Sequence, residues 1–369
     1  MNQQIRFCSS ADGTKIAYAI SGEGPPLVMS MTWVTHLEHS VRSLAWQGWL
    51  EALSRDYTLL RYDCRGCGLS DRQVKIQSFD SWIADLEAVV RASGFGRFDV
   101  LGVCSGGPVA VAYAARHPER VNRLVLYGTY ARGRFKRAEI PTEAEKGQVL
   151  LAMLRLGWAQ ENHPFLQAWA SAFQPGGTVE HFRSWCALQR ASTCAETSAE
   201  MFQTISDLDV RSIASQLRCS ALVLHAERDA VAPLDEGRLL AGIIPGARFV
   251  QLDSDNHILI PGEPAWARFL SEIRGFLHAH NADPEAGLPD ERFTALTQRE
   301  AEILEGVARG LDNSQIAADL SLSEKTVRNH VTSLFDKLNV NSRARAIVLA
   351  RKAGFGHGNR PGPVSRLRF

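Results

Sequence analysis

Short apolar runs alternate with amphipathic stretches over the first 278 residues of the chain. Eight runs have the length and composition of strands, and we expect strands at 5–8, 15–20, 26–31, 58–62, 98–103, 121–127, 221–226 and 247–252. Amphipathic segments with helical spacing lie between many of them, at 43–54, 79–93, 107–117, 235–244 and 264–278. The alternation predicts an α/β fold: a mostly parallel sheet with helices on both faces.

The segment 131–215 interrupts this alternation. It has helical spacing and is rich in aromatic residues, among them Trp158, Trp169, Phe173 and Trp185. We interpret it as a helical cap inserted over the sheet. Its rings either form the core of the cap or line a ligand pocket, and the pattern alone leaves both interpretations open.

A second, smaller domain follows the first. Residues 279–293 are polar and contain Pro and Gly, which is typical of a linker. Helical spacing resumes in 294–356, and we expect 357–369 to be a flexible tail. The sequence therefore predicts a large α/β domain over 1–278 and a small all-α domain over 294–356.

The small domain has the pattern of a helix-turn-helix. Thr297 and Glu300 form a capping box that opens a first helix, and Ser323 caps a third. The third helix places apolar residues on one face and polar residues on the other, namely Lys325, Arg328, Asn329, Thr332 and Asp336. Arg and Asn side chains are suited to bidentate contacts with base edges, although a plain helical bundle with a solvated face has the same geometry.

Charge is distributed unevenly between the two parts. Residues 287–369 carry 13 Lys/Arg against 9 Asp/Glu, whereas the rest of the chain carries 28 against 31. A basic small domain beside an acidic large one agrees with nucleic-acid binding.

The run from Leu296 to Gly354 closely resembles the LuxR/FixJ-type helix-turn-helix. The pieces that carry the resemblance are "LTQRE", "GLDNSQIA", "SEKTVRNH" and "KLNVNSR". The resemblance implies that the third helix enters the major groove of double-stranded DNA with Arg328, Asn329 and Thr332 toward the bases. It also implies that Lys325, Thr326 and Lys337 hold phosphates.

Partners of the small domain follow from the same resemblance. Such domains bind as two-fold dimers, which implies a homodimer and a palindromic operator. RNA polymerase is a further candidate partner. A two-component receiver or an acyl-homoserine-lactone receptor is disfavoured, because the region ahead of the linker has a different pattern.

The large domain contains the arrangement of a nucleophile elbow. Gly102-Val103-Cys104-Ser105-Gly106 comes directly after an apolar strand and directly before a helix. Asp229 and His257 each follow a later strand, so all three side chains are expected at one edge of the sheet. We predict a triad in which Cys104 attacks, His257 moves the proton and Asp229 orients His257, with the backbone N–H of Ser105 as an oxyanion donor.

Residues 12–278 resemble the α/β-hydrolase fold, and specifically the hydrolase halves fused to LuxR-type domains. Further matching pieces are 63–70 and 116–121. Two departures matter. The nucleophile is a thiol, which dienelactone hydrolases also use. The strand at 26–31 leads into Met31-Thr32-Trp33 without the usual His-Gly, so the second oxyanion donor, the backbone near Trp33, lacks its glycine.

The sequence is compatible with three functions. The chain is a transcription regulator whose large domain binds a small-molecule ligand, a thiol-dependent ester, lactone or thioester hydrolase with a DNA-binding tail, or a regulator whose large domain only dimerises.

Other features narrow the class of protein. The first residues lack the apolar core of a signal peptide and no run is long and apolar enough to span a bilayer, so we expect a cytoplasmic protein without membrane contact. The seven cysteines are expected to be free thiols. Cys64 and Cys67 have no second pair at zinc-site spacing, so neither a metal nor a cofactor is expected. His36 and His39 lie either at the pocket or at the surface.

Overall fold

The computed structural model describes residues 2–30, 33–74, 77–137, 141–158, 164–278, 293, 296–338, 340, 342–352 and 355–356. The chain divides into two compact units, Met1–Ile273 and Arg274–Phe369. The predicted linker, apart from Phe293, and the predicted tail lie outside the described residues, so these two boundaries stay predictions. No helix in the described ranges combines the length and the apolar character that a membrane crossing requires.

The large unit is built on one eight-stranded sheet, and every expected strand is confirmed. The strands run in the order β1-β2-β4-β3-β5-β6-β7-β8. β1 and β2 are paired antiparallel, β2 also pairs antiparallel with β4, and the remaining pairs are parallel. Their bounds are β1 Gln3–Ser9, β2 Lys15–Ser21, β3 Pro26–Ser30, β4 Thr58–Tyr62, β5 Phe98–Val103, β6 Val121–Tyr127, β7 Ser220–Ala226 and β8 Arg248–Leu252.

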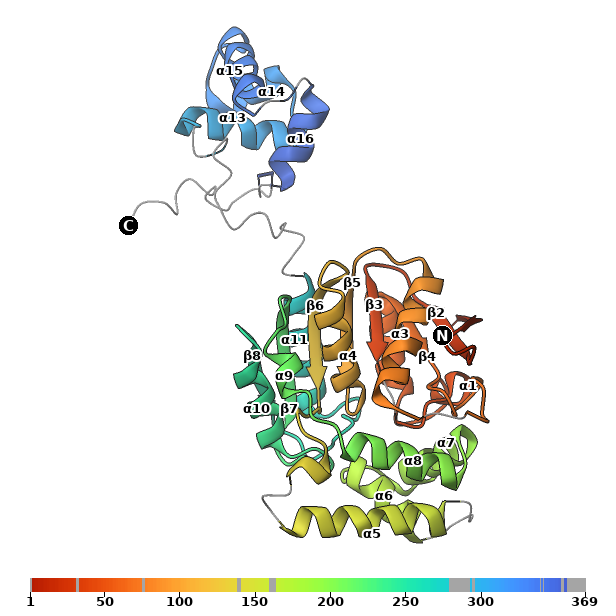
Figure 1. The fold of residues 1–369 in the computed structure, drawn as a ribbon. Helices are drawn as coiled ribbons and strands as arrows, with labels where there is room; N and C mark the ends of the chain where they lie inside the picture. The colour runs from red at the N-terminus through yellow and green to blue at the C-terminus, as the bar shows by residue number, and fades with distance from the viewer. Residues whose placement is uncertain are drawn as a thin grey trace. The chain divides into compact units, whose positions relative to one another are not determined.

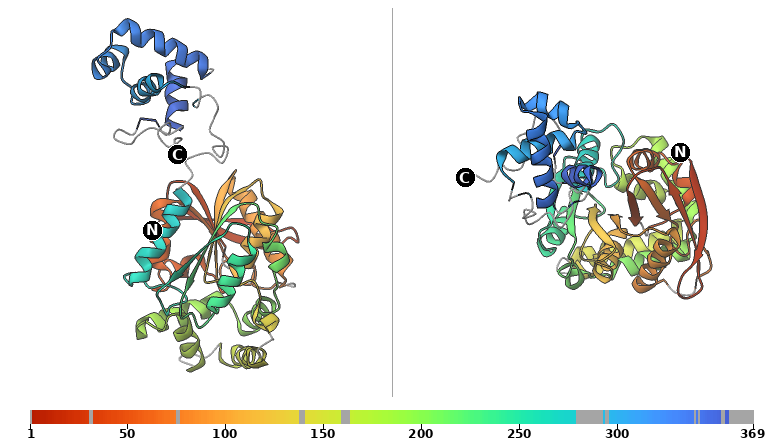
Figure 2. Two further views of the ribbon diagram at one scale, coloured as in Figure 1. Left: turned by 90° about the vertical axis from the view of Figure 1, so that its left-hand side faces the viewer. Right: turned by 90° about the horizontal axis from the view of Figure 1, so that it is seen from above.

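Helices cover both faces of this sheet (Figures 1 and 2). On one face α2 and α11 meet through Trp49, whose ring centroid lies 4.4 Å from that of Phe269. On the other face α4 contacts α3 and α9, and α9 contacts α10. The bounds are α1 Leu37–Ser40, α2 Gln47–Asp56, α3 Phe79–Ser93, α4 Gly106–Arg116, α9 Arg211–Ala214, α10 Leu234–Ile243 and α11 Pro264–His278.

One helix boundary differs from the prediction. We expected a helix from residue 43, but α2 begins at Gln47. Residues 41–46 form turns instead, in which the Trp46 N–H donates to the Ser43 carbonyl oxygen at 3.0 Å. Ser43 also takes part in a side-chain contact with the cap, where the Ser184 hydroxyl lies 3.3 Å from the Ser43 hydroxyl. Tertiary contacts therefore override the helical periodicity at this end.

The predicted cap consists of a 3-10 helix η1 and four α-helices grouped at the end of the sheet to which β3 and β6 point (Figure 1). Trp158 is part of its core, because its indole N–H donates to the Thr193 carbonyl oxygen at 2.9 Å. Helix α9, which falls inside the predicted cap range, packs against α4 and α10 and so belongs to the sheet layers. The bounds are η1 Arg134–Arg137, α5 Pro141–Gly157, α6 Pro164–Phe173, α7 Val179–Ser192 and α8 Ala195–Ser206.

The small unit contains the expected helix-turn-helix. Its helices are α13 Gln298–Ala308, α14 Asn313–Leu320, α15 Glu324–Lys337 and α16 Arg343–Lys352. Ser321, in the turn before α15, has a left-handed backbone with φ of 53°, which ends α14 abruptly. The apolar faces predicted from spacing form one core that includes Ile303, Val307, Val327 and Leu334.

Glu300 joins the first helix of this unit to the third. It closes the capping box with Thr297, whose backbone N–H lies 2.8 Å from Glu300 Oε2. The same carboxylate accepts from Lys337 Nζ at 2.7 Å and from the Ser333 hydroxyl at 3.0 Å. Burial raises the pKa of Glu300, but the hydrogen bonds from Lys337 and Thr297 outweigh it and hold the pKa at about 2.

We predict that Glu300→Gln loosens the packing of α13 on α15. Losing a charge-assisted bond to a partly exposed lysine is expected to cost about 1 kcal/mol of unfolding free energy. The ionised carboxylate contributes stability above its ordinary pKa of 4.5, and this contribution is lost as the pH falls toward about 2. Hydrogen-exchange protection of the α13 and α15 amides, compared at about pH 6 and about pH 3.5, measures this pH-dependent contribution of Glu300 to stability.

The control for this variant is Glu302→Gln on the same helix. Glu302 pairs with Arg299 at 2.7 Å, and both side chains are more than a third exposed. Such a pair contributes little, so protection is expected to change by less than about 0.5 kcal/mol. Equal losses in the two variants, or an equal dependence on pH, would contradict the role given to Glu300.

Candidate functional site

Cys104 lies in the tight turn between β5 and α4. Its backbone φ is 50°, which lies in the left-handed region that residues other than glycine rarely adopt. The Cys104 N–H donates to the Tyr127 carbonyl oxygen at 3.0 Å, and the Gly107 N–H donates to the Cys104 carbonyl oxygen at the same distance. Gly102 permits the turn, because a Cβ there would lie 2.8 Å from the Cα of Gly107. This is the strained geometry of a nucleophile elbow.

Asp229 and His257 form a buried pair beside this turn. Asp229 follows β7, His257 follows β8, and the His257 Nδ1 atom lies 2.6 Å from the Asp229 Oδ2 atom. The backbone N–H groups of Val231 and Ala232 donate to the other carboxylate oxygen at 2.8 and 2.9 Å. Both side chains of the pair are fully buried, so the carboxylate is fixed in one orientation.

The pair carries strongly shifted pKa values. Burial disfavours a charge on His257, but the Asp229 carboxylate and the Cys104 thiol raise the pKa of the ring to about 10. Burial also acts against the charge on Asp229, yet His257 keeps the pKa of that carboxyl below its ordinary value. The His257 Nε2 atom is buried, and a hydrogen bond to the Cys104 side chain is among the causes that raise the pKa of the ring. The structure thus brings Cys104, His257 and Asp229 together.

Sequence reasoning missed His225, which supports Asp229 from behind. It is fully buried on β7, and its Nε2 atom lies 2.8 Å from the Ala232 carbonyl oxygen and 3.6 Å from Asp229 Oδ2. Burial lowers the pKa of His225, so the neutral ring donates to Ala232 and fixes the loop that carries Asp229. Its only signal in the sequence was its place on the strand, four residues before Asp229.

A small, partly open chamber lies at the Cys104 thiol. Its volume is about 20 Å³, room for about one water molecule. The aromatic cap residues Phe173 and Trp185 belong to its walls, so these two rings line a cavity, whereas Trp158 packs inside the cap. The complete lining is Trp33, Val34, Trp46, Val103, Cys104, Ser105, Phe173, Trp185, Leu188, Gln189 and Ile258.

Gln189 fixes the roof of the chamber. It is fully buried, and its side-chain oxygen accepts from the indole N–H groups of Trp185 at 2.9 Å and Trp169 at 3.2 Å. Because both indole groups are occupied in this way, the roof presents mainly carbon to the thiol. Trp46 and Gln189 were not foreseen as site residues, since neither lies in a motif.

The segment predicted to supply the second oxyanion donor, around Trp33, lacks the glycine that is usual at this place. Trp33 and Ser105, the two predicted backbone donors, both line the chamber. Val34, next to Trp33, has a φ of 37°, which is strained for a β-branched residue. Two strained backbones, at Val34 and Cys104, therefore border the same small space. Residues 31 and 32 lie outside the described ranges, and the donor role of Trp33 stays a prediction.

A larger cavity lies on the other side of Phe173. Its volume is about 610 Å³, and Phe173 lines both it and the chamber. Its walls come from α5 and α6 of the cap and from Ala230 and Val231, which follow Asp229. Apolar side chains such as Leu150, Met153 and Trp169 form much of the wall, with Arg134, Glu145 and Lys146 among the polar ones. This cavity is large enough for a small organic molecule.

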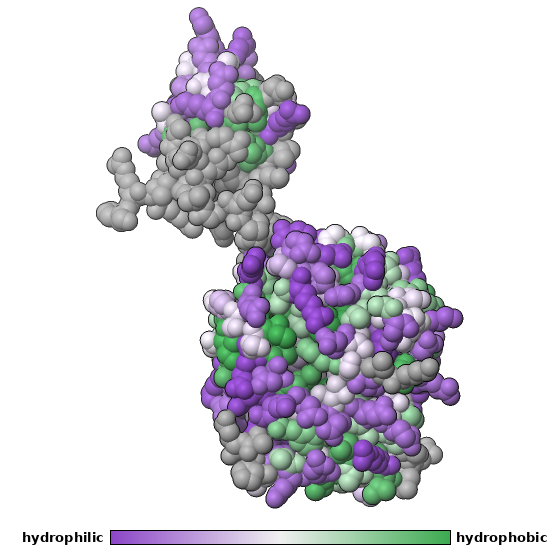
Figure 3. All heavy atoms as spheres, viewed as in Figure 1, coloured by the Kyte–Doolittle hydropathy of each residue, from purple (hydrophilic) through white to green (hydrophobic). Residues whose placement is uncertain are grey.

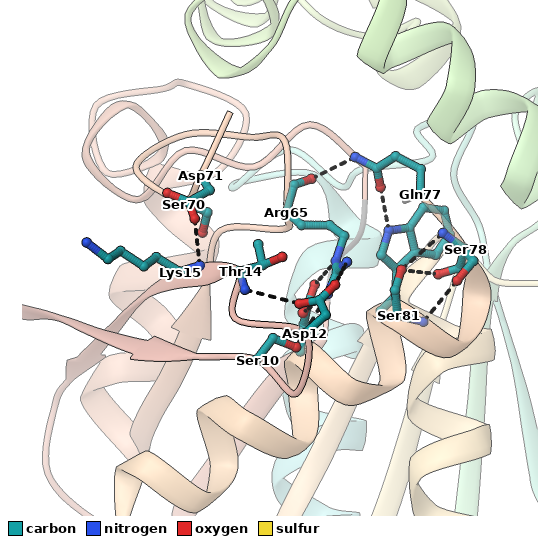
Figure 4. Close-up of polar contacts among 12 residues, drawn as sticks. Ser10, Asp12, Thr14, Lys15, Arg65, Ser70, Asp71, Gln77, Ser78 and Ser81 are labelled. Carbon is teal, nitrogen blue, oxygen red and sulfur yellow. Dashed lines mark hydrogen bonds and ion pairs between the residues drawn. The ribbon is translucent and has the colours of Figure 1, made fainter. Parts of the chain in front are cut away.

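The remaining candidate motifs of this domain have structural roles. Arg65 joins the β1–β2 turn to α3, with Nη1 2.7 Å from Asp12 and Nη2 2.6 Å from Asp85 (Figure 4). Cys64 and Cys67 are buried free thiols, and burial raises the pKa of both. Across the described residues, no group of three or more His, Cys, Asp or Glu side chains is placed to hold a metal ion.

His36 and His39 lie away from the chamber. His36 caps α1, where its Nδ1 atom accepts from the His39 N–H at 3.4 Å. It borders a separate small cavity together with Arg61, Tyr62 and Asp63. His39 is exposed. Neither histidine is among the residues that line the Cys104 chamber.

The face of α15 predicted to meet DNA is exposed. Lys325, Arg328, Asn329 and Thr332 are all exposed, whereas Val327 and Val331 beneath them are buried. In Figure 3 polar side chains predominate at the end of the small unit where α15 lies. Arg328 is 3.4 Å from Glu324, an exposed pair that holds it weakly. The side chains predicted to read bases are therefore accessible.

Two predicted phosphate contacts have other partners in the structure. Lys337 pairs with Glu300, and its side chain is only 35% exposed. The Thr326 hydroxyl lies 2.7 Å from that of Ser323, within the cap of α15. The roles of both residues toward phosphates stay predictions. A DNA phosphate would compete with Glu300 for the Lys337 ammonium group. Lys325, which is exposed, is better placed for a backbone contact.

Comparison with known proteins agrees with this division. Residues 37–264 match the family of the α/β hydrolase fold, and residues 294–350 match the bacterial regulatory proteins of the luxR family. A pyrrolizixenacetamide deacetylase of Xenorhabdus hominickii is 24% identical over 269 residues, 71% of this chain and 94% of that protein. A solved hydrolase of Pseudomonas aeruginosa PA01 superimposes with a TM-score of 0.61 at 25% identity, covering 74% of this chain and 98% of that one.

The C-terminal part is similar to regulators with a different remainder. The nitrate/nitrite response regulator NarP of Escherichia coli (strain K12) is 37% identical over 101 residues, 26% of this chain and 46% of that protein. The similarity to NarP thus covers the end of the chain, and the similarity to hydrolases covers its first three quarters. The chain belongs to the α/β hydrolase fold family and carries at its C-terminal end the DNA-binding domain of the luxR-type regulatory proteins.

Proposed function

We propose that this chain is a transcription regulator in which the hydrolase-fold domain binds a small molecule and thereby changes the binding of DNA. The observation that supports it is the joining of a helix-turn-helix with an exposed Arg328 and Asn329 to a domain that has a ligand-sized cavity, which shares Phe173 as a wall with the chamber at Cys104. A ligand regulates only if it binds the two states of the protein with different free energies.

The proposal includes the assembly and the place of action. A homodimer on a palindromic operator follows from the two-fold symmetry typical of such domains, and a cytoplasmic location gives access to DNA and to RNA polymerase. A large domain that only dimerises would leave its cavities without a role in regulation.

A second candidate function is a thiol-dependent hydrolase of esters, lactones or thioesters. It is favoured by the convergence of Cys104, His257 and Asp229 and by the raised pKa of His257. In this function His257 Nε2 takes the proton of the Cys104 thiol and Asp229 keeps the ring oriented.

Arg328→Ala is expected to relax sequence preference. The operator is first selected from random duplexes with the full chain, and affinities for it and for single-base variants are then compared at fixed salt. Removing a side chain that contacts a base should cost about 1–3 kcal/mol on the selected site and much less on mismatched sites.

Lys325→Ala is the matched control, one helical turn away and equally exposed. It should weaken binding to all duplexes alike and reduce the slope of log affinity against log salt by about one. A uniform loss from Arg328→Ala would contradict its assignment. A full chain that selects no sequence would refute the regulator itself, and a broad metabolite set that never shifts operator affinity would refute ligand sensing.

His257→Gln is expected to slow the reaction of Cys104 with iodoacetamide by at least about tenfold at neutral pH. The charged His257 ring stabilises the negative charge that the sulfur carries as it attacks, and glutamine cannot carry the compensating charge. Peptide mass spectrometry measures alkylation at Cys104 and, in the same sample, at the exposed Cys194. Cys194 is the internal control and should react at an unchanged rate. Equal rates at Cys104 in the two proteins would argue against a working Cys–His pair.

A further inference from the structure

We propose that Cys104 retains the acyl group of its ligand as a long-lived thioester, and that this acylated state is the signal that the DNA-binding domain responds to. The inference rests on the proposed function, because it names the form in which the ligand is held. It assigns a covalent modification site to Cys104 and an activated acyl compound, such as an ester, lactone or thioester, as the ligand class.

The chemical step uses only groups that the structure places together. The Cys104 thiol gives its proton to the neighbouring His257 Nε2, and the sulfur attacks the carbonyl carbon of the ligand. The bond from that carbon to the leaving group then breaks, and the leaving group takes the proton from His257. One thiol and one acyl compound thus give one thioester and one alcohol or thiol.

Hydrolysis of the thioester needs a second molecule, water, in the same space. The empty chamber has a volume of about 20 Å³, which holds about one water. Its walls are largely carbon, and the amide oxygen of Gln189 is already occupied by two indole N–H groups. An acyl group on the thiol occupies this space, and among the lining residues the largely apolar walls offer an attacking water few polar groups besides His257 and the Trp33 indole N–H.

Acylation also has to move the roof of the chamber. Even a short acyl group is larger than one water, and Phe173, Trp185 and Gln189 close the chamber from α6 and α7. Phe173 packs on His257 with a ring-centroid distance of 5.3 Å and on Trp185 at 4.8 Å. Because packed rings shift together, acylated and free Cys104 must correspond to different arrangements of the cap.

The neighbouring cavity can hold the leaving group of the ligand. It has a volume of about 610 Å³ and shares Phe173 as a wall with the chamber. A leaving group with apolar surface fits there, while a small apolar acyl group reaches the thiol past Phe173. The ligand class is therefore an activated acyl compound with a short apolar acyl part.

The test uses the full chain and the p-nitrophenyl esters of acetate and butyrate as probes. The expected result is one rapid equivalent of nitrophenolate per chain, followed by much slower release. Intact mass should rise by one acyl group, and peptide mapping should place it on Cys104. The acylated protein should bind the selected operator with an affinity changed at least about fivefold. Cys104→Ala should lose the burst, whereas Cys194→Ala should keep it.

Phe173→Leu is expected to shorten the lifetime of the thioester several-fold, because it opens the wall between the chamber and the larger cavity to water. Phe182→Leu is the matched control, since Phe182 lies on α7 but lines neither cavity. Its thioester should persist as in the unaltered chain, and both variants should still show the burst if they are folded.

The outcomes separate this inference from the function on which it rests. Steady release without a burst, or release from Cys104→Ala at the same rate, overturns the stable thioester and leaves the DNA-binding function standing. A stable thioester that leaves operator affinity unchanged overturns its role as the signal. Failure of the unmodified chain to select any operator refutes the proposed function, which the chemistry of Cys104 does not affect.

Discussion

The hydrogen bond between His257 and Asp229 is the interaction on which the geometry of the N-terminal site depends. Two ionisable groups are fully buried at 2.6 Å, an arrangement that is stable only when every remaining polar atom is satisfied. Val231 and Ala232 satisfy the carboxylate from the backbone, and His225 fixes the loop that supplies them. With Nδ1 held by Asp229, the His257 Nε2 atom faces the Cys104 thiol.

Reactivity and access to water oppose each other at this site. The strained turn at Cys104 presents the thiol at the N-terminal end of α4. The cap closes over it with aromatic rings and leaves about 20 Å³. A hydrolase needs water at each turnover, whereas a receptor needs its ligand to stay. The small volume of the chamber favours retention, as the proposed thioester requires.

The C-terminal domain is stabilised by helix caps and an ion pair in addition to its core. It lacks a large core, so capping boxes at Thr297 and Asp312 and the bond from Lys337 to Glu300 supplement the packing of its helices. These contacts lie away from the face that bears Arg328 and Asn329. Among the residues predicted to contact DNA, Lys337 and Thr326 also have structural roles, in the pair with Glu300 and in the cap of α15.

Local patterns were enough to identify the eight strands, the helix-turn-helix and the elbow at Cys104, because apolar period, glycine spacing and capping residues act over a few neighbouring positions. They also placed Asp229 and His257 at one edge, since parallel strands end together. Trp46, Gln189 and His225 could not be found in this way, because their roles arise from contacts between segments far apart in the sequence. The closure of the chamber and the pairing of Lys337 with Glu300 depend on side-chain packing in three dimensions, which no periodicity encodes.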